Sequence, residues 1–310
     1  MWQVRSRVRA DLLAAYPTEA LVRHQRDLQI EITRMLERRF TAGYASQPEL
    51  TQARLALNQA VLALRQNQKQ RAENLARLAA AVGVSAAAID GAVISFDALK
   101  QLPPVAALPP AEARRKALLS RPDVLAALAE YEASQSALQL EISKQYPDIS
   151  LGPGYLWDAG QVKWSLGLSL VLPLLNRNEG PIAEAEAHRS EAAAAFLSVQ
   201  AKAIAEVDQA LAGYGHAIQM LETADALLQD QQKNERAVAA AFKTGEVDRL
   251  TWLSDQYQTV TAELARFNAL SQAQQSRGHL EEALRRPIGA NTLAVTAKRV
   301  IESKSHRDGE

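Results

Sequence analysis

Two stretches of alternating residues, 149–157 and 164–172, interrupt long segments that are rich in Ala, Gln and Glu. In both stretches every second residue is apolar and mostly large, and most residues between them are Gly or Ser. A period of two is typical of a β-strand, whose side chains point alternately to opposite faces. The residues 158–161 between the stretches read as a turn. The sequence thus predicts one β-hairpin, with an apolar face made of Ile149, Leu151, Pro153, Tyr155, Trp157, Trp164, Leu166, Leu168, Leu170 and Leu172.

Two features of this hairpin indicate a strand pair that faces lipid. Three aromatic residues, Tyr155, Trp157 and Trp164, cluster at the turn end, as in the aromatic girdle of a membrane barrel. The apolar face continues for about ten residues per strand, the length that a tilted strand needs to cross a bilayer. Since one hairpin would leave unpaired edge amides in lipid, it would have to join other strands in a closed barrel. The same alternation also fits a hairpin that packs on helices, so the pattern alone leaves both interpretations open.

The rest of the chain has the composition of long helices. Hydrophobic residues make up 47%, but Ala supplies much of this share, and aromatic residues make up only 5%. The net charge is zero, which disfavours a nucleic-acid binder, and the absence of Cys excludes disulfides and thiolate metal sites. We expect no transmembrane helix, because no run of 18 residues is apolar. Helices are expected over 2–42, 49–82, 111–119, 122–145, 181–244 and 248–285.

Two of these helices show a heptad pattern that predicts packing against a neighbouring helix. In 49–82 the pattern consists of Leu50, Leu57, Leu64 and Leu78, with Ala53, Ala60 and Leu75 beside it. In 248–285 it consists of Leu253, Tyr257, Val260, Leu264 and Phe267.

The chain also contains an internal repeat. Phe40 corresponds to Phe242 and Gly43 to Gly245, in both cases 202 positions apart with no gap between them. In each copy a long helix runs into Phe-x-x-Gly, turns, and continues as a heptad helix. Gly accepts the left-handed conformation that commonly ends a helix. We therefore expect a long antiparallel helical hairpin that is used twice.

No arrangement of residues predicts an active site, a cofactor or a metal. The five histidines are scattered, and Glu184 with His188 is read as a solvated pair on a Glu-rich helix. No phosphate-binding loop and no Ser-His-Asp signature is present. We expect a protein that is not an enzyme.

The hairpin, the helix after it, the Phe-x-x-Gly turn and the returning helix together resemble the outer-membrane efflux proteins of the TolC family. The segment SRPDVLAALAEYEASQSALQLEISKQYPDISLGPGY (120–155) is similar to the family's Arg-Pro-Asp helix and the Tyr-Pro that opens a barrel strand. The segment WSLGLSLVLPLLNRNEGPIAEAEA (164–187) resembles the returning strand, and its Pro-Leu-x-Asn-Arg-Asn ending is like the cobalt–zinc–cadmium resistance branch. The resemblance covers about residues 2–289.

This resemblance implies a mainly α fold of two coiled-coil hairpins, with a transmembrane β-hairpin in a barrel shared by a homotrimer. The expected domains are 1–82, the first helical hairpin; 83–121, an equatorial connector; 122–147, a helix; 148–175, the barrel hairpin; 176–286, the second helical hairpin; and 287–310, a flexible tail. The implied function is passive export through an outer-membrane duct, with a periplasmic adaptor and an inner-membrane RND pump as partners. The implied substrates are heavy-metal cations or small toxic compounds.

By position, the resemblance assigns the periplasmic gate and the adaptor contact to the two helical turns. Phe242 falls where the family often has a gating aromatic residue and Glu49 where a gating acid occurs. Val247 replaces an Arg that some members use, which puts an ion-pair gate in doubt. The assigned turn residues are Phe40, Gly43, Tyr44, Glu49, Phe242, Gly245, Glu246, Val247, Asp248 and Arg249.

Compared with the family, the sequence has no signal peptide, no first helix and no first strand hairpin before residue 2. We expect an N-terminally truncated product or a misassigned start of a protein that lies in the outer membrane, with its helices in the periplasm. The alternative is a coiled-coil interaction protein, either soluble or a periplasmic adaptor, that forms no pore.

Overall fold

A computed structural model describes residues 18–85, 102–104, 109–170 and 177–288. The chain is mainly helical, and its described strands form one two-stranded antiparallel sheet, as predicted. It divides into two compact units, Met1–Ala113 with Val207–Glu310, and Arg114–Glu206. The elements are α2 (Glu19–Thr41), α3 (Gln47–Val82), α5 (Pro110–Ser120), α6 (Pro122–Ser143), β1 (Ile149–Asp158), β2 (Gln161–Leu170), α7 (Glu179–Thr244) and α8 (Arg249–Leu284).

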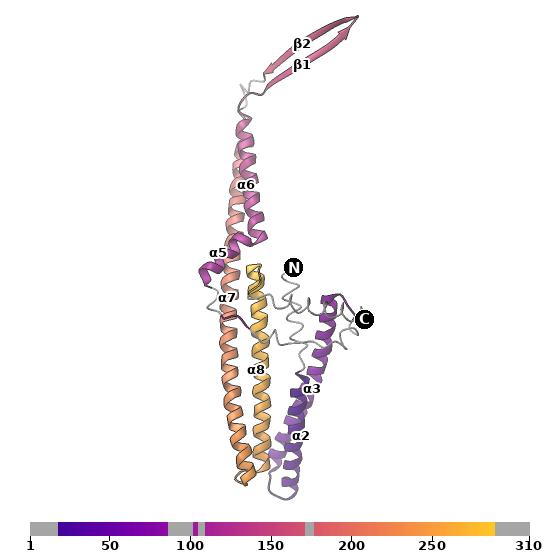
Figure 1. Ribbon diagram of the computed structural model, residues 1–310, viewed down its shortest axis with the longest axis vertical. Helices are drawn as coiled ribbons and strands as arrows, with labels where there is room; N and C mark the ends of the chain where they lie inside the picture. Colours follow the sequence, from indigo (N-terminus) through magenta and orange to yellow (C-terminus); the bar gives the residue numbers. More distant parts are fainter. Residues whose placement is uncertain (1–17, 86–101, 105–108, 171–176, 289–310) are drawn as a thin grey trace, which may run out of the picture. The chain divides into compact units, whose positions relative to one another are not determined.

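In the first unit, α2 lies along both α3 and α8 (Figure 1). The contact between α2 and α8 is apolar, with Leu28 and Ile32 of α2 buried against Leu253 and Val260 of α8. Burying one such side chain stabilises a fold by about 1.5–3 kcal/mol, so this cluster is the main force between the two helices. Four of the five residues of the predicted heptad pattern of α8 lie in this contact, because Tyr257 and Leu264 also pack on the cluster.

The helix α3 begins and ends at residues suited to these positions. Ser46 and Glu49 form a capping box, in which each side chain accepts a hydrogen bond from the other residue's backbone N–H. Gly83 ends the helix in the left-handed conformation, with φ of 80°. Five of the seven residues of the predicted heptad face of α3 are buried, and Leu57 and Leu75 are half-buried; the five are Leu50, Ala53, Ala60, Leu64 and Leu78.

Buried hydrogen bonds connect α2 to α3. The carbonyl oxygen of Ala53 accepts hydrogen bonds from the side chains of Gln29, at 3.4 Å, and Thr33, at 3.2 Å. Both polar side chains are buried, so these bonds compensate for their loss of water.

A second buried region of the first unit surrounds Tyr214 of α7. Its hydroxyl donates a 2.5 Å hydrogen bond to the carbonyl of Pro103, and burial raises its pKa to about 12. Near the end of α8, the buried Arg277 donates to the carboxylate of Glu281 and to the carbonyl of Ile288. Glu281 also accepts from the N–H of Ile288, so the chain just after α8 is held by buried polar contacts.

In the second unit, Arg121 connects the start of α6 to α7. Its guanidinium is only 2% exposed and donates to Asp123 at 2.6 Å and to Glu206 at 2.7 Å. Pro122 occupies the first turn of α6, where a missing N–H costs nothing. The Arg-Pro-Asp sequence is therefore a helix start that is anchored to the neighbouring helix.

The strands β1 and β2 pair in the predicted register. Leu151 lies opposite Leu168, and Tyr155 lies opposite Trp164. Because residues directly opposite each other in an antiparallel pair share a face, the large apolar residues of both strands lie on one face, except Leu156, which lies opposite Lys163 on the other. Gly152 and Gly167 are paired on the other face.

Some predictions fall on residues outside the described ranges. These include the helix over 2–17, most of the connector, Leu172 in the second strand and the tail beyond 288. Within the described ranges, no helix combines the length and the apolar character needed to span a membrane.

Candidate functional site

The first helical turn joins α2 to α3. Gly43 has a φ of 80°, and the N–H of Tyr44 donates a 2.7 Å hydrogen bond to the carbonyl of Arg39. This bond runs from a residue beyond the helix to the last turn of α2. It gives a partner to the carbonyl of Arg39, which the helix itself leaves without one. Ser46 then begins α3 with an extended backbone.

The second turn, between α7 and α8, repeats this backbone arrangement. Gly245 has a φ of 82°, and the N–H of Glu246 donates to the carbonyl of Ala241 at 2.9 Å. Asp248 begins α8 and accepts from the N–H of Thr251 at 2.8 Å. Each of these positions lies 202 residues after its counterpart in the first turn. The predicted repeat is confirmed for both helix ends and both helix starts.

Ion pairs connect the two turns to each other. Arg39, at the end of α2, binds Asp248 at 2.5 Å, and Arg249 of α8 binds Glu31 of α2 at 2.9 Å. All four side chains are between 38% and 58% exposed, so each pair contributes about 0.2–1 kcal/mol. The pairs therefore orient two turns that the apolar contact between α2 and α8 already holds together.

The carboxylates of Glu49, in the first turn of α3, and of Asp248, at the start of α8, are both kept ionised. The pKa of Glu49 is lowered by hydrogen bonds from the backbone N–H and the hydroxyl of Ser46. The pKa of Asp248 is lowered to about 2, first by the N–H of Thr251 and then by Arg39. Glu49 was assigned to a gate by position, but here its carboxylate is part of a capping box.

The aromatic residues differ between the turns. Phe40 is 38% exposed and Tyr44 is 86% exposed. In the second turn Phe242 stacks face to face on Trp252, with ring centroids 4.9 Å apart and planes 3° from parallel. Sequence reasoning did not include Trp252, although it lies 202 positions after Leu50, which is buried at the start of α3.

Three assigned residues of the second turn remain: Glu246, Val247 and Arg249. Glu246 is exposed, Val247 is half-buried, and the N–H of Val247 donates to the carbonyl of Ala241 at 3.4 Å. Arg249 is the partner of Glu31 described above. The structure thus brings all ten assigned residues to the two turns, and their roles in gating and adaptor contact stay predictions.

The apolar face of the β-hairpin is exposed over its whole described length. Its Ile, Leu, Tyr and Trp side chains are between 48%, at Leu170, and 78%, at Trp164, exposed. Near the turn, Tyr155 and Trp164 meet edge to face, with ring centroids 5.0 Å apart. The turn itself has positive φ at Ala159 and Gly160, as a tight two-residue hairpin requires.

Within the described residues, no group of three or more His, Asp or Glu side chains is arranged to hold a metal ion. The arrangement that the structure does show is a set of paired helical turns in one unit and an apolar hairpin in the other.

Comparison with known proteins gives a consistent result. The model of the family described as "Outer membrane efflux protein" matches residues 113–285. The cobalt-zinc-cadmium resistance protein CzcC of Cupriavidus metallidurans is 25% identical over 298 residues, which are 91% of this chain and 69% of CzcC. A membrane protein from Pseudomonas aeruginosa has a similar structure, with a TM-score of 0.66 and 24% identity over 91% of this chain and 67% of that chain. The outer membrane protein VceC from Vibrio cholerae has a TM-score of 0.63 and 20% identity over 92% of this chain and 69% of VceC.

Proposed function

Because the chain belongs to the outer membrane efflux protein family, we propose that it acts as the outer-membrane exit duct of a tripartite, RND-type efflux system. The family is one of efflux proteins and not of enzymes. On this proposal three copies form one channel, and residues 148–175 of each copy contribute strands to its barrel. Residues 1–82 and 176–286 supply the helical hairpins of a periplasmic tunnel.

The exposed apolar face of the β-hairpin is the observation that supports this function most directly. An isolated two-stranded hairpin is only marginally stable in water, even without large exposed apolar side chains. Here Leu166, Leu168 and Trp164 are all more than two-thirds exposed. Lipid would cover the exposed apolar face, and further strands would pair with the edges of the hairpin.

We assign the gate and the adaptor contact to the paired turns 40–49 and 242–249. The turns lie at the ends of their helical hairpins, and the Arg39–Asp248 pair connects them. Opening between the two hairpins would have to break this pair and the Arg249–Glu31 pair. On this proposal Phe242, which stacks on Trp252, is the gating aromatic residue.

The exported substrates on this proposal are heavy-metal cations or small toxic compounds. The similarity to a cobalt-zinc-cadmium resistance protein favours metal cations. Passage is passive, and the energy comes from the inner-membrane partner. Metal ions are therefore cargo in this proposal, and the chain needs no resident metal site.

Cysteine labelling tests the proposed topology, because the chain has no native cysteine. Gln161→Cys places a thiol at the exposed turn of the β-hairpin, and Glu246→Cys places one at the exposed turn of the second helical hairpin. A membrane-impermeant maleimide is added to intact cells and to cells with a permeabilised outer membrane. We expect Gln161→Cys to react in intact cells and Glu246→Cys to react only after permeabilisation.

Two other labelling patterns exclude the duct. If neither thiol reacts until the inner membrane is also lysed, the chain lies in the cytosol. If both thiols react only after the outer membrane is permeabilised, the chain is periplasmic and the hairpin does not cross the outer membrane.

A further inference from the structure

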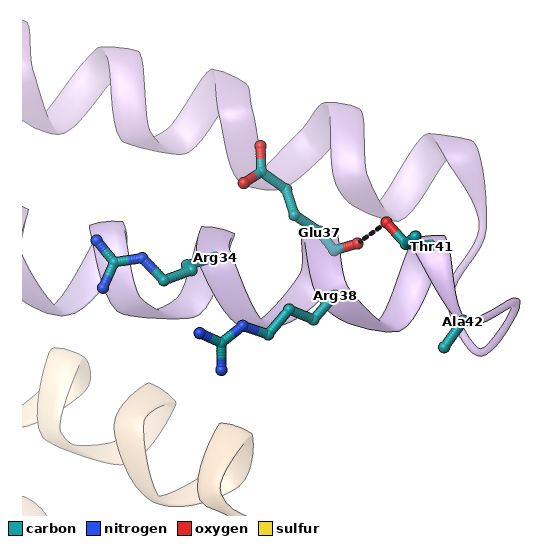
Figure 2. Close-up of a pocket in the computed structure, with 5 residues that line it drawn as sticks. All are labelled: Arg34, Glu37, Arg38, Thr41 and Ala42. Atoms are coloured by element: carbon teal, nitrogen blue, oxygen red, sulfur yellow. Dashed lines mark hydrogen bonds between the residues drawn. The ribbon is translucent and has the colours of Figure 1, made fainter.

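The outer face of α2 near the first turn carries an open groove of about 530 Å³ (Figure 2). It is lined by Arg34, Glu37, Arg38, Thr41 and Ala42. Figure 2 shows the guanidinium groups of Arg34 and Arg38 on the same side of the helix, and the carboxylate of Glu37 directed towards the neighbouring helix. The groove therefore presents two cationic groups along one helix, and small side chains where the helix ends.

The charges around this groove are unequally compensated. Glu37 binds Arg54 of α3 at 2.9 Å, and Glu31, one turn earlier on α2, binds Arg249. Among the residues that the structure describes, neither Arg34 nor Arg38 has a carboxylate within ion-pair distance. The two arginines stand four residues apart on a helix, a spacing at which like charges repel. This pair thus costs stability in the free chain and would gain most from an anionic partner.

The second repeat lacks this cationic pair. The residue 202 positions after Arg34 is Arg236, but the residue 202 positions after Arg38 is Ala240. The second turn instead carries the carboxylates of Glu246 and Asp248. The two hairpins therefore share a backbone and differ in the charge that they present beside the turn.

We propose that Arg34 and Arg38 form the docking surface for an acidic helical segment of the periplasmic partner, which lies along α2. Two carboxylates four residues apart on a partner helix lie about 6 Å apart along its axis, which matches the spacing of the two arginines. Thr41 and Ala42 leave room for the partner chain where the groove reaches the turn. This inference rests on the proposed function and assigns recognition of the partner's charge to the first hairpin alone.

A binding experiment with the full chain in detergent tests this surface. Two synthetic helical-hairpin peptides serve as probes, identical except that solvent-facing positions four apart carry Glu in one and Lys in the other. We expect the Glu peptide to bind in fluorescence anisotropy, with an affinity that falls as NaCl is raised from 50 to 300 mM. The Arg34→Gln/Arg38→Gln variant should bind it about tenfold more weakly.

The matched control is Arg236→Gln, which removes the corresponding arginine of the second repeat and should leave the affinity unchanged. Circular dichroism verifies that all variants keep their helices, as expected for exposed positions. Equal binding of the Glu and Lys peptides, or an unchanged affinity of the double variant, overturns the proposal. A loss of self-association in the double variant, measured by light scattering, also overturns the proposal, because the groove would then be an interface between copies of the chain.

The labelling experiment separates this inference from the proposed function. If Gln161→Cys reacts from outside the cell but the chain binds the Glu and Lys peptides equally, the chain is a duct that docks its partner elsewhere. A chain that prefers the Glu peptide through Arg34 and Arg38 but shows no external labelling has the docking surface without the duct.

Discussion

Replacing Gly43 or Gly245 by alanine measures the backbone strain of the two helical turns almost in isolation. Their φ angles are 80° and 82°, and a Cβ built at either position meets no atom within 4 Å. The change therefore adds no clash, and only the left-handed conformation is penalised. For a residue with a Cβ, this penalty is about 1–2 kcal/mol.

The net effect is smaller, because alanine also restricts the unfolded chain. This restriction stabilises the folded state by about 0.4–1 kcal/mol, so each variant should lose about 1 kcal/mol. With a urea m-value of about 3 kcal/mol/M, the midpoint of the first unit's unfolding should fall by about 0.3 M. Circular dichroism of the helices in a urea titration measures this shift.

Gly213→Ala provides the control within the same unit. Gly213 lies inside α7 without a positive φ, and its Cβ would also meet open space. Alanine there should stabilise the helix by about 0.5–1 kcal/mol and raise the midpoint. If Gly43→Ala or Gly245→Ala raised the midpoint as Gly213→Ala does, the left-handed conformation of these two glycines would be refuted. If the two turn variants differed by more than about 1 kcal/mol, the two turns would not be equivalent in energy.

Four further changes have defined outcomes. Arg121→Gln removes two charge-assisted hydrogen bonds, but Asp123 and Glu206 are 45% and 39% exposed and stay hydrated, so we expect a loss of about 2 kcal/mol in a urea titration, with Arg121→Lys recovering part of it. Asp248→Asn keeps a good helix cap but removes the charge. Because the pKa of Asp248 is about 2 when folded and 3.8 otherwise, its ionisation stabilises the fold above pH 3.8 and ceases to do so as the pH falls towards 2, and this part of the acid unfolding curve should be absent from the variant. Tyr214→Phe should cost about 1 kcal/mol at pH 7, and since burial raises the pKa of Tyr214 to about 12, the variant should also lose the fall in stability that the wild type shows as the pH rises from 10 to 12. Trp252→Leu, which copies Leu50 of the first repeat, should lose about 0.5–1.5 kcal/mol of stacking and make Phe242 more accessible, measured by calorimetry and by oxidative footprinting of Phe242.

The regular parts of the fold could be predicted because they depend on local patterns. The register of β1 and β2 follows from the alternation, since a slip of one residue would exchange the two faces. The paired turns could be predicted from Gly43 and Gly245, because a glycine in the left-handed conformation ends a helix without help from distant residues. Even the capping box of α3 could be read from Ser46-x-x-Glu49, although Glu49 was interpreted as a gating residue.

The contacts between distant segments could not be predicted in the same way. Arg39 and Asp248 are 209 positions apart and meet only because α2 packs along α8. The stacking of Phe242 on Trp252 depends on how closely α7 and α8 approach beside the turn. Neither follows from periodicity, which specifies the buried face of a helix but not its neighbour.

A duplicated helical turn can keep its backbone while its surface changes. The backbone here needs only a glycine at the helix end and a capping oxygen at the next helix start, supplied by Ser46 in one turn and Asp248 in the other. Side chains beside these positions are free to differ without loss of the turn. In the second turn an aromatic stack and the Arg39–Asp248 pair direct the side chains towards the chain itself. In the first hairpin Tyr44 and the two arginines of the α2 groove remain exposed, and the docking proposal rests on this difference in surface charge.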